Sequence, residues 1–360
     1  IENTYRVEFD YLTEKSPDYI AGHTSQQTHD DIAELLERLR RRPEIEAVSL
    51  SQNSYPYNGS NSGAEVSYDT LRSPGWTIRR LVTPDFPRVF RYRGTRGETP
   101  EQLAEMLERG EFMASDNLYR KYDRRMTDLV GQRFYLFGDT TKTYRLGAAL
   151  QNVRYHDYDQ ARSSYSMMVK QSFYYIGLEL CVRVREGQDN DFIEKLKADS
   201  ESQFRVGNIF ISEIRSFKDI RRNYQQAWTN DIRNYVMGMG FLLLNIFLGL
   251  LGTFWFRTQQ RRKEIALRLA MGSPRRGIFS YLMYEGILLL TLAVIPATVI
   301  AFNIGYAELV DVGRMPFDTG RFLSALVVTW MLMALMIVAG IWYPAYGAMR
   351  VHPAKALHDE

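Results

Sequence analysis

Few residues of this chain have the types and spacing that catalysis or metal binding requires. Two acid pairs could serve as calcium ligands, but the other positions of a calcium-binding loop are missing: Asp157 with Asp159, and Asp189 with Asp191. Three histidines stand at spacings that metal ligands do not use: His23, His29 and His156. The sequence has no phosphate-binding loop, nucleophile elbow or zinc-protease motif. We therefore expect these residues to be ordinary loop or surface residues, and the chain to have no catalytic residues, metal site or cofactor of its own.

Composition separates a polar part from an apolar part. Residues 1–230 are polar and rich in Tyr and Arg, whereas 235–348 contain three long apolar stretches. The formal net charge of +3 is too small to indicate nucleic acid binding. Cys181 is the only cysteine, which rules out an intramolecular disulfide. The apolar stretches indicate a protein of the lipid bilayer.

The longest uncharged stretch is Tyr235–Phe256, 22 residues that end at a basic segment. A helix of that length is about 33 Å long, enough to cross a hydrocarbon core of about 30 Å. The preceding residues, 219–234, are polar and contain neither Pro nor Gly. We therefore expect one helix over Lys218–Phe256, a stalk outside the membrane that continues through it.

Two further spans are expected over 286–306, with a kink at Pro296, and over 322–343, with Pro344 marking the end. Asn245 either bonds a neighbouring helix or is a tolerated single polar residue. Five aromatic residues stand near span ends, as interfacial aromatics do: Tyr235, Trp255, Tyr306, Trp342 and Tyr346.

Basic residues predict the orientation. The segment 257–284 carries seven Lys and Arg, and the tail adds Arg350 and Lys355. The loop between the second and third spans carries only Arg314 and Arg321. Segment 257–284 and the tail are therefore expected in the cytoplasm, and the large amino-terminal domain outside. Such a domain needs an earlier span, so we expect sequence upstream of Ile1 to have been removed.

The amino-terminal part is expected to be an α+β domain with its own core, with room for two subdomains. Alternating apolar residues predict a strand over 5–11, a helical spacing predicts a helix around 32–39, and 44–51 is a second strand. Thr99 with Gln102 forms a capping box that starts another helix. Other elements are expected as strands at 64–68, 76–82, 89–92, 176–184 and 205–214, a hairpin of 134–137 with 143–146, and a helix at 191–202.

The basic segment after the first span has apolar residues that could dock. Ile265, Leu267, Leu269 and Met271 predict a short helix, and Gly272-Ser273-Pro274 then breaks it before Arg275. The segment is a plain anchor flank, a helix lying among lipid headgroups, or a lever that docks onto a cytoplasmic motor.

This segment, Arg261–Ile278 (RRKEIALRLAMGSPRRGI), resembles the cytoplasmic segment of FtsX/MacB-type ABC transporter permeases, whose pattern is approximately R-x-R-E-I-G-x-R-x-A-x-G-A-x-x-x-x-I. Glu285 follows at the start of the next span, and 344–357 resembles the closing P-A…P-x-x-A-L of the family. The sequence departs from the pattern at Ala266, where the family has Gly, and at Pro274. The family has four spans, the first before the external domain, and an ATPase domain that this chain lacks.

The resemblance implies a dimeric, multi-pass permease of the bacterial inner membrane with a MacB-like periplasmic domain. Its spans would carry no substrate pathway but would pass motion from a cytoplasmic ABC ATPase, which binds the ATP, to the periplasm (mechanotransmission, type VII). The expected divisions are a periplasmic domain over 1–217, a stalk over 218–234 and a transmembrane domain over 235–360. A second copy or a paralogous permease, a periplasmic adaptor and a lipoprotein are the further partners considered.

The resemblance also assigns site residues. The ATPase-coupling residues are Arg262, Lys263, Glu264, Ile265, Arg268, Ala270, Gly272 and Ser273. The stalk residues expected to carry force are Arg221, Tyr224, Trp228 and Asn234.

Several processes stay open within this interpretation: efflux, lipoprotein release, resistance to peptide antibiotics and control of cell-wall hydrolases. Division-type permeases usually have a smaller external domain, and peptide-resistance types usually have more spans. The alternative from another class is a membrane-anchored sensor or adhesion module without a motor. An envelope hydrolase is the poorest alternative, because the sequence contains no nucleophile constellation.

Overall fold

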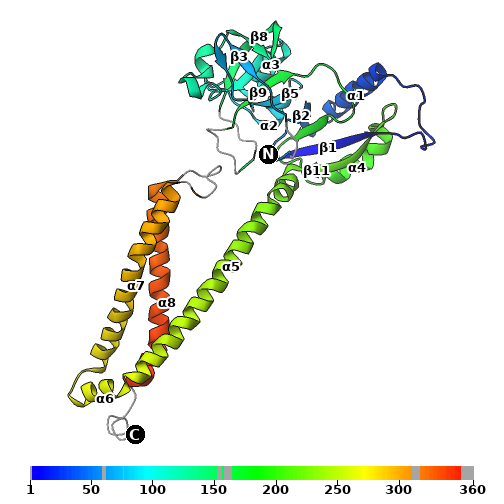
Figure 1. Ribbon diagram of the computed structural model, residues 1–360. Coiled ribbons are helices and arrows are strands. Elements are labelled where there is room, and N and C mark those ends of the chain that lie inside the picture. Colours follow the sequence, from blue (N-terminus) through cyan, green and yellow to red (C-terminus); the bar gives the residue numbers. More distant parts are fainter. Residues whose placement is uncertain are drawn as a thin grey trace. The chain divides into compact units, whose positions relative to one another are not determined.

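The computed structural model describes residues 2–58, 62–75, 77–151, 156–157, 164–307, 309 and 317–349. The chain forms two compact units, Ile1–Ala227 and Trp228–Glu360. The first unit contains a mixed β-sheet with helices, and the second is helical (Figure 1). Each unit is described by itself.

The strands of the first unit join in one sheet in the order β11-β1-β10-β2-β5-β9-β6-β8-β7-β3-β4. Strands β5 and β9 run parallel, as do β6 and β8, whereas β1 runs antiparallel to both of its neighbours. The strands are β1 (Thr4–Tyr11), β2 (Ile45–Gln52), β3 (Val66–Tyr68), β4 (Leu71–Arg72), β5 (Ile78–Val82), β6 (Phe112–Ser115), β7 (Arg133–Leu136), β8 (Asp139–Leu150), β9 (Ser166–Lys170), β10 (Glu179–Val184) and β11 (Ile209–Ser216).

One apolar cluster lies at the β11 end of the sheet, where α1 (Ser25–Arg40) and α4 (Phe192–Gln203) pack on the strands. Helix α1 buries Ile32, Leu35, Leu36 and Leu39, which share one helical face because their spacing follows 3.6 residues per turn. Thr24 caps this helix through a capping box with Gln27. The predicted opening of strand, helix and strand is confirmed.

Separate clusters lie at the other end of the sheet. One gathers around Phe134 and Phe112, and another lies beneath α3 (Pro100–Glu108) and the short helix α2 (Phe86–Phe90). The predicted capping box of Thr99 with Gln102 starts α3, and the predicted hairpin is β7 with β8. Two 3₁₀ turns, η1 (Arg120–Tyr122) and η2 (Met126–Leu129), precede that hairpin.

Several predictions about the first unit are wrong. The strand expected at 89–92 is the end of helix α2, because Pro87 favours a helix start and Arg91, at φ 54°, ends the helix in the left-handed region. The strand expected from 205 begins only at Ile209, after a turn at Gly207. Strands β6 and β9 were not predicted, since nearly all of their residues are buried and do not alternate. Residue 76, where one strand was expected to begin, lies outside the described residues.

Among the described residues, three helices are long and apolar enough to cross a membrane: α5 (Phe217–Gln260), α7 (Arg275–Tyr306) and α8 (Thr319–Met349). A short helix, α6 (Arg262–Ala270), follows α5 directly. The predicted single helix over Lys218–Phe256 is confirmed by α5, which contributes residues to both units. Pro296 lies inside α7.

The second unit has an apolar core of Met283 and Leu290 on α7 with Ile337 and Ile341 on α8, joined by residues of α5 such as Phe254. The third candidate span, Thr319–Trp342, ends close to the predicted end at Pro344, although helix α8 itself continues to Met349. A proline removes a single backbone hydrogen bond, and membrane helices tolerate that loss. Asn245 donates to the carbonyl of Phe241 in its own helix (2.8 Å). The family's closing tail pattern at 351–357 lies outside the described residues.

Candidate functional site

The coupling segment begins where α5 gives way to α6. Arg261 is the residue between the two helices, and its N–H still donates to the carbonyl of Arg257 (3.0 Å) while its own carbonyl accepts from Ile265 (2.9 Å). Helix α6 buries Ile265 and Ala266 and exposes Leu267 and Met271. Of the apolar residues predicted to dock, Ile265 therefore packs within the unit, and Leu267 and Met271 are accessible.

A tight turn ends α6. The N–H groups of Met271, Gly272 and Ser273 donate to carbonyls of the last helical turn, and Gly272 has a φ of +91°. Residues with a Cβ rarely adopt this conformation, so glycine is the residue that suits the turn. Pro274 is then the N-cap of α7. The predicted break at Gly272-Ser273-Pro274 is thus a helix C-cap followed by a new helix.

Charged side chains of the segment turn toward α7. Arg261 donates to Glu285 on α7 (Nη1 to Oε2, 2.8 Å), and Arg257 lies 3.7 Å from the other carboxylate oxygen. Arg268 pairs with Glu264 on its own helix (2.5 Å) and lies over the ring of Tyr281 on α7, 5.2 Å from the ring centre. The remaining predicted coupling residues that the structure describes are Lys263 and Ala270, which are exposed, and Ser273, which is half-buried.

Sequence reasoning assigned no role to Glu285 or Tyr281, and the structure describes only the backbone of Arg262, the first residue of α6. A signal for Glu285 existed in the sequence. It is the only acidic residue between Glu264 and Glu308, in a segment that contains three basic residues, Arg268, Arg275 and Arg276. A lone acid among bases at a span end indicates an ion pair.

The root of α5 is fixed within the first unit. Ser216 caps the helix by accepting from the N–H of Asp219 (3.2 Å). Phe217 is buried against the rings of Tyr55 (5.6 Å) and Phe90 (5.3 Å). The first residue of the helix is therefore part of the core of the unit that precedes it.

Asp157, which lies outside α5, accepts three hydrogen bonds, two of them from residues of the next turns of that helix. They come from Tyr57 (2.9 Å), from Arg221 (2.7 Å) and from Gln225. Desolvation alone would raise the pKa of Asp157, but these hydrogen bonds outweigh it and the pKa is lowered. Burial, with the bond to Asp157, raises the pKa of Tyr57 to about 12.

Two of the predicted stalk residues meet in this group. Arg221 pairs with Asp157, and Tyr224 lies edge-on to Tyr57 (6.0 Å) and close to His156 (5.4 Å). The other two, half-buried Trp228 and exposed Asn234, belong to the second unit. Asp159, the expected partner of Asp157 in an acid pair, lies outside the described residues.

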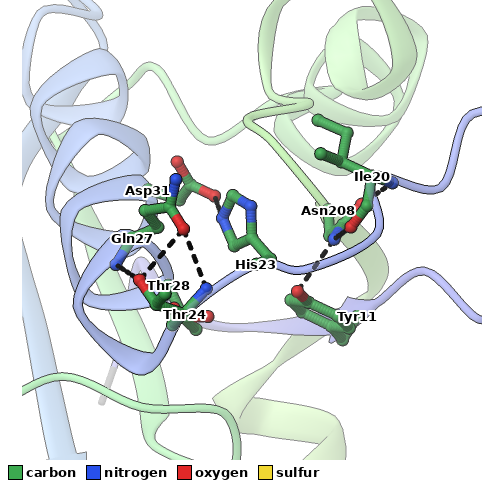
Figure 2. Close-up of polar contacts among 8 residues, drawn as sticks. All are labelled: Tyr11, Ile20, His23, Thr24, Gln27, Thr28, Asp31 and Asn208. Atoms are coloured by element: carbon green, nitrogen blue, oxygen red, sulfur yellow. Dashed lines mark hydrogen bonds and ion pairs between the residues drawn. The ribbon is translucent and has the colours of Figure 1, made fainter.

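Of the histidines predicted to be ordinary surface or loop residues, His23 lies in the loop before α1, whereas His29 lies within α1. The side chain of His23 is only 8% exposed and bonds Asp31 (2.7 Å), and His29 accepts from the N–H of Tyr174 (2.8 Å). Figure 2 shows the same region, where Asn208 bonds both the N–H and the carbonyl of Ile20 (2.8 Å each). These contacts hold the long loop before α1. Among the described residues, no group of three His, Cys, Asp or Glu lies close enough to bind a metal ion.

A buried carboxylate holds the loop after β2. Glu179, 6% exposed, accepts through Oε2 from the hydroxyl of Ser51 (2.9 Å) and from the N–H groups of Ser54 (2.9 Å) and Tyr55 (3.4 Å), and through Oε1 from Asn58. Desolvation raises the pKa of Glu179. This loop carries Tyr55 and Tyr57, whose rings contact Phe217 and Tyr224 at the start of α5. Glu179 therefore fixes the loop that holds the start of α5.

The fold and these sites define a membrane protein: an α+β unit, three helices able to span a bilayer, and a short helix between the first and second of them. Residues 236–353 match the family model of the FtsX-like permease C-terminal domain. This match supports the predicted resemblance to FtsX-type permeases over that part of the chain, and the prediction of an α+β domain followed by helices able to span a membrane agrees with the structure.

The comparison with solved structures gave a similarity to the crystal structure of the periplasmic region of MacB from Actinobacillus actinomycetemcomitans. The sequence identity is 9%, the match covers 62% of this chain and 93% of that chain, and the TM-score is 0.36. The comparison with curated proteins gave no match.

Replacing Arg221 by alanine should loosen the root of α5, because Asp157 then loses its charged partner. We expect hydrogen exchange of the amides at 218–227 to accelerate a few-fold, as loss of an exposed ion pair costs about 0.5–1 kcal/mol. The matched control is Arg222→Ala, since Arg222 pairs with Asp219 on its own helix. Mass spectrometry of the full-length chain in detergent measures both, and equal exchange in the two variants would refute the role of Asp157.

Proposed function

We propose that this chain is a permease subunit of an ABC transporter that passes ATP-driven motion from a cytoplasmic ATPase to a domain on the other side of the membrane. It would act in the bacterial inner membrane, with its first unit in the periplasm and α6 in the cytoplasm. The ATPase would bind and hydrolyse the ATP, and this chain would do neither.

The single observation that carries the proposal is the continuity of α5. One helix of 44 residues begins inside the core of the α+β unit at Phe217 and ends at Gln260, one residue before α6. A helix is stiff along its axis because every turn is hydrogen-bonded to the next. A displacement of α6 would therefore reach strand β11 without passing through a flexible linker.

The coupling residues would divide between two tasks. Lys263, Leu267 and Met271 have exposed side chains and would form the surface that docks onto the ATPase. Ile265 and Ala266 are buried within the unit and would fix the helix to its neighbours. Arg221 and Tyr224 would fix the other end of α5 through Asp157 and Tyr57.

ABC permeases of this family act in pairs, so we propose a homodimer or a pair with a paralogous permease. The protein that binds the first unit would decide whether the process is release of a lipoprotein, efflux or another envelope process. An adaptor or lipoprotein in the periplasm is the expected kind of partner.

The test is affinity purification of the full-length protein from its native membrane in mild detergent, under conditions that trap ATP, with mass spectrometry of the associated proteins. We expect an ABC ATPase among them, or fused to the native chain, and an ATPase rate that changes when the permease is bound. Absence of any ATPase would remove the motor and favour a membrane-anchored sensor.

Gly272→Val in the same preparation should reduce the coupled ATPase rate about tenfold. A β-branched residue at a φ of +91° is strained, so the turn between α6 and α7 would shift. The matched control is Gly277→Val, because a Cβ at Gly277 meets only Pro274 at an ordinary 3.5 Å. Coupling that survives Gly272→Val unchanged would contradict the assignment of Gly272.

A further inference from the structure

Two contacts join α6 to α7, one near each end of α6. At the start of α6, the guanidinium of Arg261 bonds the carboxylate of Glu285 (2.8 Å), with Arg257 on the other oxygen (3.7 Å). At the end, the guanidinium of Arg268 lies over Tyr281 (5.2 Å). Tyr281 and Glu285 are four residues apart on α7 and therefore share a face. The two contacts form an antiparallel register between α6 and α7.

We propose that Glu285 and Tyr281 are positioning residues that clamp the coupling helix α6 to α7, so that α5, α6 and α7 move as one body. This inference rests on the proposed function, because α6 is taken as the segment that receives force. It assigns Arg268 to the clamp, whereas the family resemblance placed it in the docking surface. It also gives Arg261, the residue between two helices, a partner that fixes their junction.

The chemistry suits a rigid joint. Arg261 occupies the junction, where the backbone leaves the α5 axis at φ −90° and ψ 11°, and without a side-chain anchor this junction could bend. Glu285 is 25% exposed in its side chain and lies next to Gly286, whose surroundings include side chains of α5 and α8. A carboxylate at the end of a membrane span favours a cationic partner, and a charge-assisted hydrogen bond is stronger than a neutral one.

The other end of α6 is held differently. A guanidinium over an aromatic face is attracted to the ring without a fixed hydrogen-bond direction. Glu264 bonds the same guanidinium from the preceding turn of α6 (2.5 Å) and orients it toward Tyr281. Ile265 and Ala266, which lie between the two clamp points in sequence, are buried, so apolar packing also holds α6 within the unit.

The first measurement of the clamp does not involve an ATPase. A spin label on Met271→Cys, at the exposed end of α6 (71%), reports the mobility of that helix in the full-length chain in lipid nanodiscs. Cys181 is fully buried and is replaced by serine in this background. We expect Glu285→Gln and Tyr281→Leu to increase the label's rotational mobility at least about twofold, whereas Arg276→Gln, an exposed cation of the same segment, leaves it unchanged.

The charge exchange Arg261→Glu with Glu285→Arg separates a clamp from a folding defect. The double variant should restore the mobility of the parent, while each single reversal raises it. A label equally mobile in Glu285→Gln and in Arg276→Gln would overturn the clamp, as would a double exchange that restores nothing.

The second measurement is the coupled rate of the ATPase that copurifies with the chain. We expect Glu285→Gln to retain the ATPase and to lower the coupled rate about tenfold, since one charge-assisted hydrogen bond is lost. An unchanged coupled rate with a mobile α6 would overturn the positioning role. If the variants raise the mobility of α6 as predicted but no ATPase copurifies with the parent chain, the clamp is supported and the proposed function is refuted.

Discussion

Replacement of Glu179 by alanine is expected to accelerate the reaction of Cys181 with a thiol reagent about a hundredfold in the full-length chain. The change leaves four donors without their acceptor, two of them backbone N–H groups, and each such loss costs about 1–3 kcal/mol. Cys181 is fully buried two residues away on β10 and is the only cysteine, so its reaction reports the opening of the first unit alone.

Glu179→Gln is the matched control, because an amide oxygen can replace the carboxylate oxygen that accepts from Ser51, Ser54 and Tyr55. We expect it to cost much less than alanine. Dithiodipyridine, which reacts in acid as well as at neutral pH, measures the rate for all three chains. Equal rates for alanine and the parent would contradict the structural role of Glu179.

The parent and Glu179→Gln also test how the stability of the first unit depends on pH. Because burial raises the pKa of Glu179 above its unfolded value, the protonated group stabilises the folded unit fully below the unfolded pKa. That contribution is lost as the pH rises through the raised folded pKa. The parent should therefore lose stability relative to Glu179→Gln over this window. A parent that gains stability there would contradict the sign.

Gly286→Val is expected to lower the melting temperature of the second unit by about 5 °C or more, as overpacking costs about 1–3 kcal/mol. A Cβ at Gly286 would lie 2.7 Å from Ile341 and 2.8 Å from Ile337 on α8, and 3.4 Å from Phe254 on α5. The absence of a side chain at Gly286 therefore lets side chains of both neighbouring helices approach α7 closely. The side chain of valine would force the three helices apart.

The control is Gly277→Val, on the same helix, where a Cβ makes only an ordinary contact with Pro274. Heating in detergent followed by size-exclusion chromatography measures the fraction that stays monodisperse. The same loss in both variants would show that helix propensity, rather than packing at Gly286, decides the outcome.

Local signals in the sequence predicted much of the fold. The capping box at Thr99 and the alternation over Tyr5–Tyr11 predicted their elements because each signal lies within the element itself. Proline was less reliable: Pro87 belongs to a helix that was predicted as a strand, and Pro344 lies within α8. Strands β6 and β9, rich in Met, Ala and Ser, lack the alternation of a half-buried strand.

The sites were less predictable, for a different reason. The coupling segment is contiguous, so its pattern could be read directly from 261–278. The hydrogen-bond groups of Asp157 and Glu179 join residues that are 64 or more positions apart, and a single sequence carries no signal of such pairing. Glu285 was visible as a lone acid, but only the turn of α6 back along α7 shows which cation it meets.

Strand β1 lies between β10 and β11, the last two strands of the sheet in sequence. During synthesis, Thr4–Tyr11 must wait for residues 179–216 before either of its edges is paired, and contacts of such long range make folding slow. The strand that closes the sheet ends at Ser216, the residue that caps α5. Completion of the sheet and attachment of the long helix are therefore the same event in the folding of this chain.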